Sequence, residues 1–237
     1  MGFFSALFEH DEKPVEKLIE ASKSGDIEKV KRLLTEGADV HVGDKDGVTA
    51  LMYASENGHT EVIELLLNNG ADMNARDQHG WTALMHASWY GHAKVAELLL
   101  NRGAEVNAKA LNGATALIRA SEKGHSTVVG LLLTRGVDVD AKAGDGATAL
   151  IRAAWHGQAG VVGLLLNHGA DVNARDNNRA TALIRASWHG HIRVAELLLN
   201  KGADVNAKDN MNATAWMYAS NNKLSKIAEL LEKHGAH

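Results

Sequence analysis

The stretch Thr148-Ala-Leu-Ile-Arg-Ala-Ala-Trp-His-Gly157 decides the fold, because it recurs along most of the chain with few changes. Copies of it begin at five other threonines, namely Thr49, Thr82, Thr115, Thr181 and Thr214. Each copy begins 33 residues after the previous one. A fixed period of this length is typical of a solenoid, in which each structural unit packs only against its neighbours. The sequence therefore predicts one elongated body built from repeated units.

The composition is ordinary for a soluble protein of 237 residues, with 45% hydrophobic and 23% charged residues. The absence of cysteine excludes a disulfide framework and thiolate metal sites, and it fits a reducing compartment. A net charge of −4 argues against a general nucleic-acid binder. The sequence contains neither an apolar run long enough to cross a bilayer nor a secretory signal pattern. We therefore expect a cytoplasmic protein.

The repeats divide the chain into internal units and capping units. We expect a tail at residues 1–13, an N-terminal capping unit at 14–44, five internal units at 45–77, 78–110, 111–143, 144–176 and 177–209, and a C-terminal capping unit at 210–237. The tail carries all three phenylalanines, Phe3, Phe4 and Phe8. We expect it to fold over the exposed end of the first unit, and a membrane or partner anchor is the alternative.

Each internal unit repeats the same signals in the same order. A turn leads to a threonine, which is a competent helix N-cap, and the short helix that follows stops at a glycine (Gly58, Gly91, Gly124, Gly157 or Gly190). A second helix carries Val-x-x-Leu-Leu-Leu. In the first unit, residues 15–22 and 26–35 are the expected helices. Gly130, Gly160 and Gly163 lie inside second helices, where each glycine costs about 1 kcal/mol of helix stability relative to Ala. We therefore expect the centre of the stack to be its least stable part.

The pattern Gly-x-Thr-x-Leu-x-x-Ala, then Gly-His, then Leu-Leu-Leu-x-x-Gly-Ala-Asp-Val-Asn-Ala resembles the ankyrin repeat over roughly residues 14–237. The resemblance implies an all-α solenoid of stacked helix-turn-helix units. It also implies β-hairpin-like turns that project from one edge and a concave groove lined by the short first helices.

The chain departs from the ankyrin pattern at two positions in every unit. Ala stands where the family has Pro after Thr. Met or Ile stands where the family has His two residues further on, at Met52, Met85, Ile118, Ile151, Ile184 and Met217. The Thr–His hydrogen bond usual in the family therefore cannot form. We expect apolar packing between neighbouring first helices in its place.

Function is expected where the units differ, because the shared residues fill the core. In the first helix the fourth, seventh and eighth residues after Thr vary, and their spacing places them on one face. All three tyrosines and three of the five tryptophans occupy these positions, and Trp81 directly precedes Thr82. Along the chain the sets are Tyr53/Glu56/Asn57, His86/Trp89/Tyr90, Arg119/Glu122/Lys123, Arg152/Trp155/His156, Arg185/Trp188/His189 and Tyr218/Asn221/Asn222.

Aromatic residues in a fixed register on a variable face are typical of the centre of a protein interface. Neighbouring helices pack about 8–10 Å apart, so Arg119, Arg152 and Arg185 should form a ladder of cations, with Trp155 and Trp188 close enough to stack on them. Alternatively, these arginines pair with Glu122 or are solvated, and the tryptophans only cover neighbouring side chains. The predicted groove consists of Tyr53, Trp81, His86, Trp89, Tyr90, Arg119, Lys123, Arg152, Trp155, His156, Arg185, Trp188, His189 and Tyr218.

These residues favour a non-catalytic protein-interaction module that binds an extended, acidic or aromatic-bearing segment of another protein. The sequence lacks a nucleophile elbow, a phosphate-binding glycine loop and a cysteine nucleophile, so we expect neither an enzyme nor a cofactor. His156 and His189 lack an evident third ligand for a metal. Two alternatives stay open. One is a protein that clamps an anionic small molecule, a lipid headgroup or single-stranded nucleic acid, and the other is an engineered ankyrin scaffold. We expect a monomer.

Overall fold

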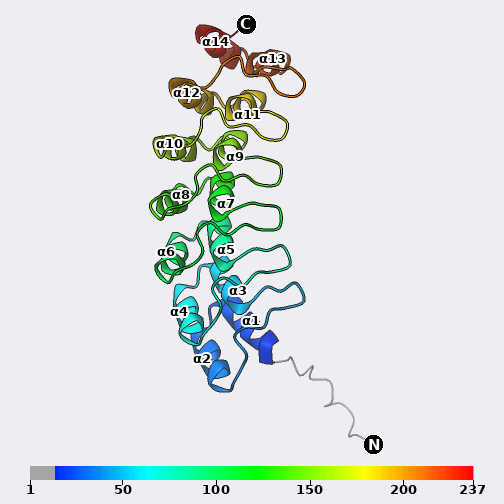
Figure 1. Cartoon of the computed structure of the whole chain (residues 1–237). Helices are drawn as coiled ribbons and strands as arrows, with labels where there is room; N and C mark the ends of the chain where they lie inside the picture. The colour runs from blue at the N-terminus through cyan, green and yellow to red at the C-terminus, as the bar shows by residue number, and fades with distance from the viewer. Residues whose placement is uncertain (1–13, 237) are drawn as a thin grey trace, which may run out of the picture.

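The computed structural model describes residues 14–236 and shows a single row of stacked helix pairs, which confirms the predicted all-α solenoid (Figure 1). The first helices are α1 (Pro14–Ser24), α3 (Ala50–Asn57), α5 (Ala83–Tyr90), α7 (Ala116–Lys123), α9 (Ala149–Trp155), α11 (Ala182–His189) and α13 (Ala215–Asn221). The second helices are α2 (Ile27–Thr35), α4 (Thr60–Asn68), α6 (Ala93–Asn101), α8 (Ser126–Leu133), α10 (Ala159–Asn167), α12 (Ile192–Asn200) and α14 (Ser225–Lys233). Each first helix contacts its own second helix, and neighbouring first helices contact one another along the stack. The expected tail with Phe3, Phe4 and Phe8 lies outside the described residues.

The threonine at the start of each repeated stretch caps its helix, as predicted. The side-chain oxygen of Thr148 accepts a hydrogen bond from the N–H of Ile151 at 3.3 Å. The other five threonines accept the same bond. Asp26 caps α2 in the same manner. Each bond satisfies one of the N–H groups that a helix leaves without a partner at its start.

The glycine between the two helices of a unit is required both by its conformation and by the space around it. Gly91 has a φ of 80°, and a Cβ at this position would lie 2.5 Å from Nδ1 of His125 in the next unit. The other ring nitrogen of His125, Nε2, lies 2.9 Å from the carbonyl oxygen of Trp89. His59, His92 and His191 bond to the preceding unit in the same way. Three predicted helices differ from the structure at their ends. Helix α1 spans Pro14–Ser24 where 15–22 was expected, and α2 begins at Ile27, after its cap Asp26, where 26 was expected. Helix α9 ends at Trp155, two residues before Gly157.

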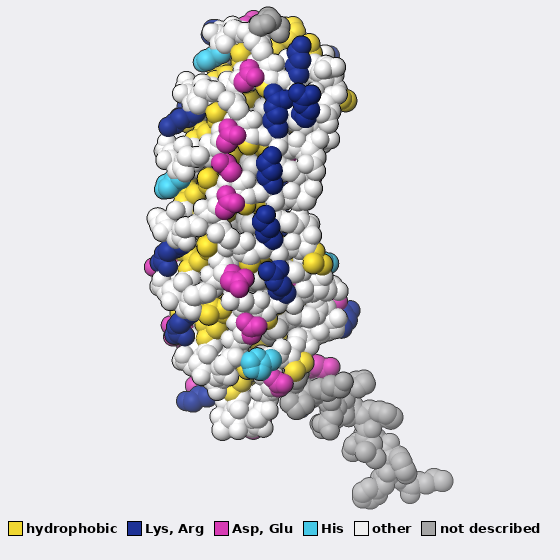
Figure 2. Space-filling view, viewed as in Figure 1, with side chains coloured by type: hydrophobic (Ala, Val, Ile, Leu, Met, Phe, Trp, Pro, Cys, Tyr) yellow, Lys and Arg dark blue, Asp and Glu magenta, His cyan; other side chains and the backbone are white. Residues whose placement is uncertain are grey.

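Charged side chains on the closing segments also connect neighbouring units. Figure 2 shows a column of Lys and Arg beside a column of Asp and Glu along the stack. In the sequence, basic residues recur every 33 residues at Arg76, Lys109, Lys142, Arg175 and Lys208. The side chains of Arg76, Lys142 and Arg175 each donate to the carbonyl oxygen of the basic residue one unit further on. These cations therefore stabilise the stacking of the turns.

The core contains mainly leucine, isoleucine, valine and alanine. Residues that stand where the ankyrin pattern has His are at most 1% exposed in five of six units, namely Met52, Met85, Ile118, Ile151 and Ile184. Met217, in the last unit that the structure describes, is 40% exposed. Apolar packing between first helices thus replaces the Thr–His hydrogen bond.

None of the helices in residues 14–236 is long and apolar enough to span a membrane. Within the same residues, no group of three or more His, Cys, Asp or Glu residues could hold a metal ion. The unit boundaries given above stay a prediction.

Candidate binding groove

The fourth residue after each Thr faces the turn that precedes its helix. In four units this residue forms a hydrogen bond with an Asp in that turn, nine positions earlier in the sequence. The hydroxyl of Tyr53 donates to Asp44 at 2.8 Å, and that of Tyr218 donates to Asp209 at 2.6 Å. The other two pairs are Asp77–His86 and Asp176–Arg185. In the two central units the turn position holds Ala110 and Ala143, and the helix position holds Arg119 and Arg152.

The two tyrosine pairs are neutral phenols bonded to carboxylates. Burial raises the pKa of Tyr218 to about 12, and the hydrogen bond to Asp209 adds to this effect. Burial alone would raise the pKa of Asp209, but bonds from Tyr218 and from the N–H groups of Ala213 and Met211 outweigh it, so this pKa is lowered. Burial, with the hydrogen bond to Asp44, likewise raises the pKa of Tyr53 to about 12.

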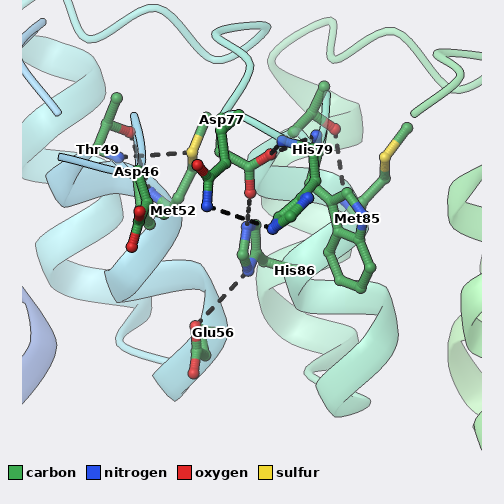
Figure 3. A network of polar contacts seen from close by, with 12 residues as sticks. Asp46, Thr49, Met52, Glu56, Asp77, His79, Met85 and His86 are labelled. Carbon is green, nitrogen blue, oxygen red and sulfur yellow. Dashed lines mark hydrogen bonds and ion pairs between the residues drawn. The ribbon is translucent and has the colours of Figure 1, made fainter. Parts of the chain in front are cut away.

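Asp77 organises the turn before α5 (Figure 3). Its Oδ1 accepts the N–H groups of His79 and Trp81 at 2.8 Å each, and its Oδ2 lies 3.3 Å from Nε2 of His86. The Nδ1 of His86 lies 3.6 Å from Glu56 on α3. Burial lowers the pKa of His86, although Asp77 and Glu56 oppose this effect. His86 therefore lies in a buried polar cluster beneath the groove surface.

Arg185 has a complete internal partner. Its Nε donates to Oδ2 of Asp176 at 3.1 Å, and its Nη2 donates to the same oxygen. The side chains of Arg185 and Asp176 are only 7% and 5% exposed. The guanidinium lies 4.7 Å from the ring centre of Trp155 and 5.8 Å from that of Trp188. The charge of Arg185 is therefore balanced inside the protein.

Arg119 and Arg152 have weaker partners. The Nη2 of Arg152 donates to Asp145 at 2.6 Å, but the side chain of Asp145 is 53% exposed. The Nη2 of Arg119 donates to the neutral side-chain oxygen of Asn112 at 3.3 Å, and its Nη1 lies 3.6 Å from Glu122. The Nε atoms of both arginines are buried, and residues 14–236 provide no hydrogen-bond acceptor for them. Burial lowers the pKa of Arg119, and the charge of Arg152 lowers it further, against the opposing effect of Glu122.

The expected cation ladder is therefore uneven. Arg185 stacks on Trp155 and Trp188 as predicted, and Arg119 lies 4.5 Å from the ring centre of Trp81. Arg152 differs: in the described part of the chain no ring contact is found for it, and its guanidinium bonds to Asp145 instead. The alternative pairing of Arg119 with Glu122 is also present.

An N-terminal aromatic cluster lies on α5 and the turn before it. Trp81 and Trp89 meet edge to face, with ring centres 5.6 Å apart. The Nζ of Lys123 lies 4.0 Å from the ring centre of Trp89, and Arg119 lies 5.4 Å from the same ring. Tyr90 is exposed and stacks on His92.

A C-terminal aromatic cluster extends over α9, α11 and α13. Trp188 stacks on Tyr218 with ring centres 4.9 Å apart and on His189 at 5.8 Å. His189 also stacks on Trp155 at 5.4 Å. Burial lowers the pKa of His189, with smaller contributions from nearby cationic groups. His156 is exposed next to this cluster and lies 3.7 Å from Glu122.

Each cluster borders a hollow between the turns and the first helices. The larger hollow has a volume of about 460 Å³, and its walls include Arg152, Trp155, Arg185, Trp188 and Tyr218. The smaller has a volume of about 290 Å³ and is lined by His79, Trp81, Leu111, Asn112 and Arg119. The structure thus brings most predicted residues together along one face.

Comparison with known proteins agrees with this architecture. The family described as "Ankyrin repeats (3 copies)" matches residues 18–110 and 108–176, and the family described as "Ankyrin repeats (many copies)" matches residues 165–219. The chain belongs to the ankyrin-repeat family. The crystal structure of the human ASB11 ankyrin repeat domain is similar, with a TM-score of 0.85 and 27% sequence identity over 93% of this ankyrin-repeat chain and 98% of that chain. No curated protein matches the sequence.

Ankyrin repeats are generally protein-interaction modules. Within this ankyrin-repeat chain, sequence reasoning missed the role of the turn residue nine positions before the fourth residue after each Thr. The signal was available in the register of the units. Reading along the chain, this position is Asp44, Asp77, Ala110, Ala143, Asp176 and Asp209.

Proposed function

We propose that this ankyrin-repeat chain binds an extended segment of a partner protein along its first helices. One observation carries the proposal: Trp81, Trp89, Trp155 and Trp188 all lie beside the two hollows or next to the cations between them. Tryptophan and arginine are the residue types that contribute most often to the energetic centres of protein interfaces.

The C-terminal end and the centre of the groove favour different side chains of that segment. At the C-terminal end the charge of Arg185 is already balanced, while Trp188 stacks on Tyr218 and is 40% exposed. This flat wall suits an aromatic or apolar side chain. In the centre, Arg119 and Arg152 have weaker partners, which suits an acidic side chain. The segment is therefore expected to be both acidic and aromatic-bearing.

We further propose that the protein is monomeric, non-catalytic and cytoplasmic. The competing possibility is an anionic small molecule, a lipid headgroup or single-stranded nucleic acid in the same groove, and the experiment below separates the two. An engineered scaffold would have the same groove, and its partner would be found by the same selection.

Selection of random twelve-residue peptides displayed on phage tests the proposal. Selected peptides should bind the Trp155→Ala variant at least about 30-fold more weakly than wild type, because an interface tryptophan contributes about 2 kcal/mol or more. Trp216→Leu is the matched control, since Trp216 donates to Glu232 on α14 instead of facing the groove. Equal binding by Trp155→Ala and wild type would contradict the proposal. Displacement of the peptides by inorganic phosphate at low salt would favour the small-anion alternative.

A further inference from the structure

The two central units differ from the others in a way that leaves arginine side chains incompletely bonded. Asp176 provides one oxygen to both Nε and Nη2 of Arg185. Ala110 and Ala143 occupy the equivalent turn position for Arg119 and Arg152, so neither arginine has this carboxylate. Asp176 provides an acceptor for Nε of Arg185, whereas Nε of both central arginines is buried without an acceptor among the residues that the structure describes. A buried donor that lacks an acceptor is energetically costly and uncommon in native proteins.

In the central units another side chain replaces the turn hydrogen bond of the missing aspartate, whereas the bond to the arginine Nε is not replaced. In the unit of Asp176, its Oδ1 accepts the N–H of Ala180 at 2.9 Å. In the unit of Ala143, the equivalent N–H of Ala147 bonds instead to Asp145 at 3.1 Å. The turn therefore keeps its bond through a residue two positions later. Because Asp145 reaches only Nη2 of Arg152, the Nε position stays unfilled.

The charges around these two arginines are also unbalanced. Arg119, Lys123 and Arg152 are three cations, and the carboxylates within ion-pair distance of the two arginines are Glu122 and Asp145. Glu122 is shared, because it also lies 3.7 Å from His156. The side chains of Arg152 and Arg119 keep 24% and 11% of their surface exposed. A ligand in the groove therefore reaches their outer atoms, while the two Nε atoms stay buried.

We propose that acidic side chains of the partner segment supply the carboxylates that Ala110 and Ala143 lack, by binding Arg119 and Arg152. This inference rests on the proposed function and specifies the chemistry of its central part. The two arginines lie on adjacent helices, which pack about 8–10 Å apart. Acidic residues at positions i and i+3 of a polyproline-II segment lie about 9 Å apart, which matches this spacing.

The observations favour a protein segment over a nucleic acid. Asp145 and Glu122 lie directly beside the two arginines and would repel a continuous row of phosphates, and the chain has a net charge of −4. A protein segment can place two carboxylates at the arginines and uncharged or aromatic side chains next to the acidic residues.

The test compares phage selection of random twelve-residue peptides on wild type and on the double variant Ala110→Asp/Ala143→Asp. The new aspartates should bond to Arg119 and Arg152 as Asp176 bonds to Arg185. Ala110→Asn/Ala143→Asn is the control of equal size without charge. Peptides from wild type should be enriched in Asp or Glu, and replacing two of these with Asn or Gln should weaken binding about tenfold, as two partly exposed ion pairs would. The Asp variant should lose this preference and the Asn variant should keep it.

Arg119→Gln/Arg152→Gln provides a second test should the aspartate variant fold poorly, and it should lose the same preference. Two results would overturn the inference: peptides without acidic enrichment, or a preference that both the Asp and the Gln variants retain. The proposed function would stay intact if Trp155→Ala still weakened binding. Failure of Trp155→Ala to weaken binding would overturn both. Displacement of the peptides by a single-stranded DNA oligonucleotide at equal concentration would also overturn the inference, because phosphates would then be the preferred anions.

Discussion

Removal of the Asp176 carboxylate should destabilise this protein far more than removal of the Asp145 carboxylate. Both carboxylates bond to an arginine at the fourth position after a Thr, Arg185 and Arg152 respectively. The difference is burial. The Asp176–Arg185 side chains are 5% and 7% exposed, while the Asp145–Arg152 side chains are 53% and 24% exposed. Asp176→Ala would remove the carboxylate that is hydrogen-bonded to the Arg185 guanidinium beside Trp155.

Breaking a buried ion pair by removing one partner costs about 3–5 kcal/mol, whereas an exposed pair contributes about 0.2–1 kcal/mol. For a chain of this size, about 2–4 °C of melting temperature corresponds to 1 kcal/mol. Asp176→Ala should therefore lower the melting temperature by roughly 6–20 °C, and Asp145→Ala by about 4 °C at most.

Calorimetry on the two variants measures this difference, with guanidinium chloride unfolding as the second probe because repeat arrays can unfold in stages. Asp176→Ala/Arg185→Leu completes a double-mutant cycle and should recover much of the loss, since an apolar replacement removes the uncompensated charge. Equal destabilisation by Asp176→Ala and Asp145→Ala would refute the conclusion that Arg185 is balanced internally.

Three further measurements test the packing and the electrostatics. Gly130→Ala and Gly163→Ala should each stabilise the protein by about 1 kcal/mol in chemical unfolding, because a Cβ at either position meets no atom within 4 Å; a loss of stability would contradict this reading. Thr148→Ala should cost about 1 kcal/mol through loss of the N-cap bond, and no change would be the contrary result. Tyr53 and Tyr218 should ionise near pH 12 in an ultraviolet titration. Because a raised phenol pKa stabilises the fold only while the phenol is neutral, the stability of the protein should fall from pH 10 to pH 12. Ionisation of all three tyrosines near pH 10 would contradict this prediction.

The backbone of this protein could be predicted from the sequence because the information is local and repeated six times. Thr148 is followed by a helix whose N–H groups need an acceptor, and the glycines that close most first helices adopt a positive φ that other residues rarely adopt. Each of these features depends on only a few neighbouring residues, so the repeat period and the capping residues together located most of them.

The electrostatics of the groove could not be predicted from the first helices alone. The partner of Arg185 lies nine residues earlier, in the preceding turn, and a comparison limited to helix positions does not include it. The same comparison treats Arg119, Arg152 and Arg185 as equivalent cations, although only Arg185 has a buried carboxylate. Arg152 bonds instead to Asp145, whose side chain also accepts the N–H of Ala147 in the same turn, and a comparison limited to helix positions does not include this residue either.

The tryptophan side chains provide the most direct test of the claim that the first-helix face is the binding surface. The indole N–H groups of the five tryptophans give separate NMR signals, and a selected acidic peptide can be titrated against them. The signals of Trp81, Trp89, Trp155 and Trp188 should shift, while that of Trp216, bonded to Glu232, should stay in place. A shift confined to Trp216, or saturable binding that moves none of the other four signals, would contradict the claim.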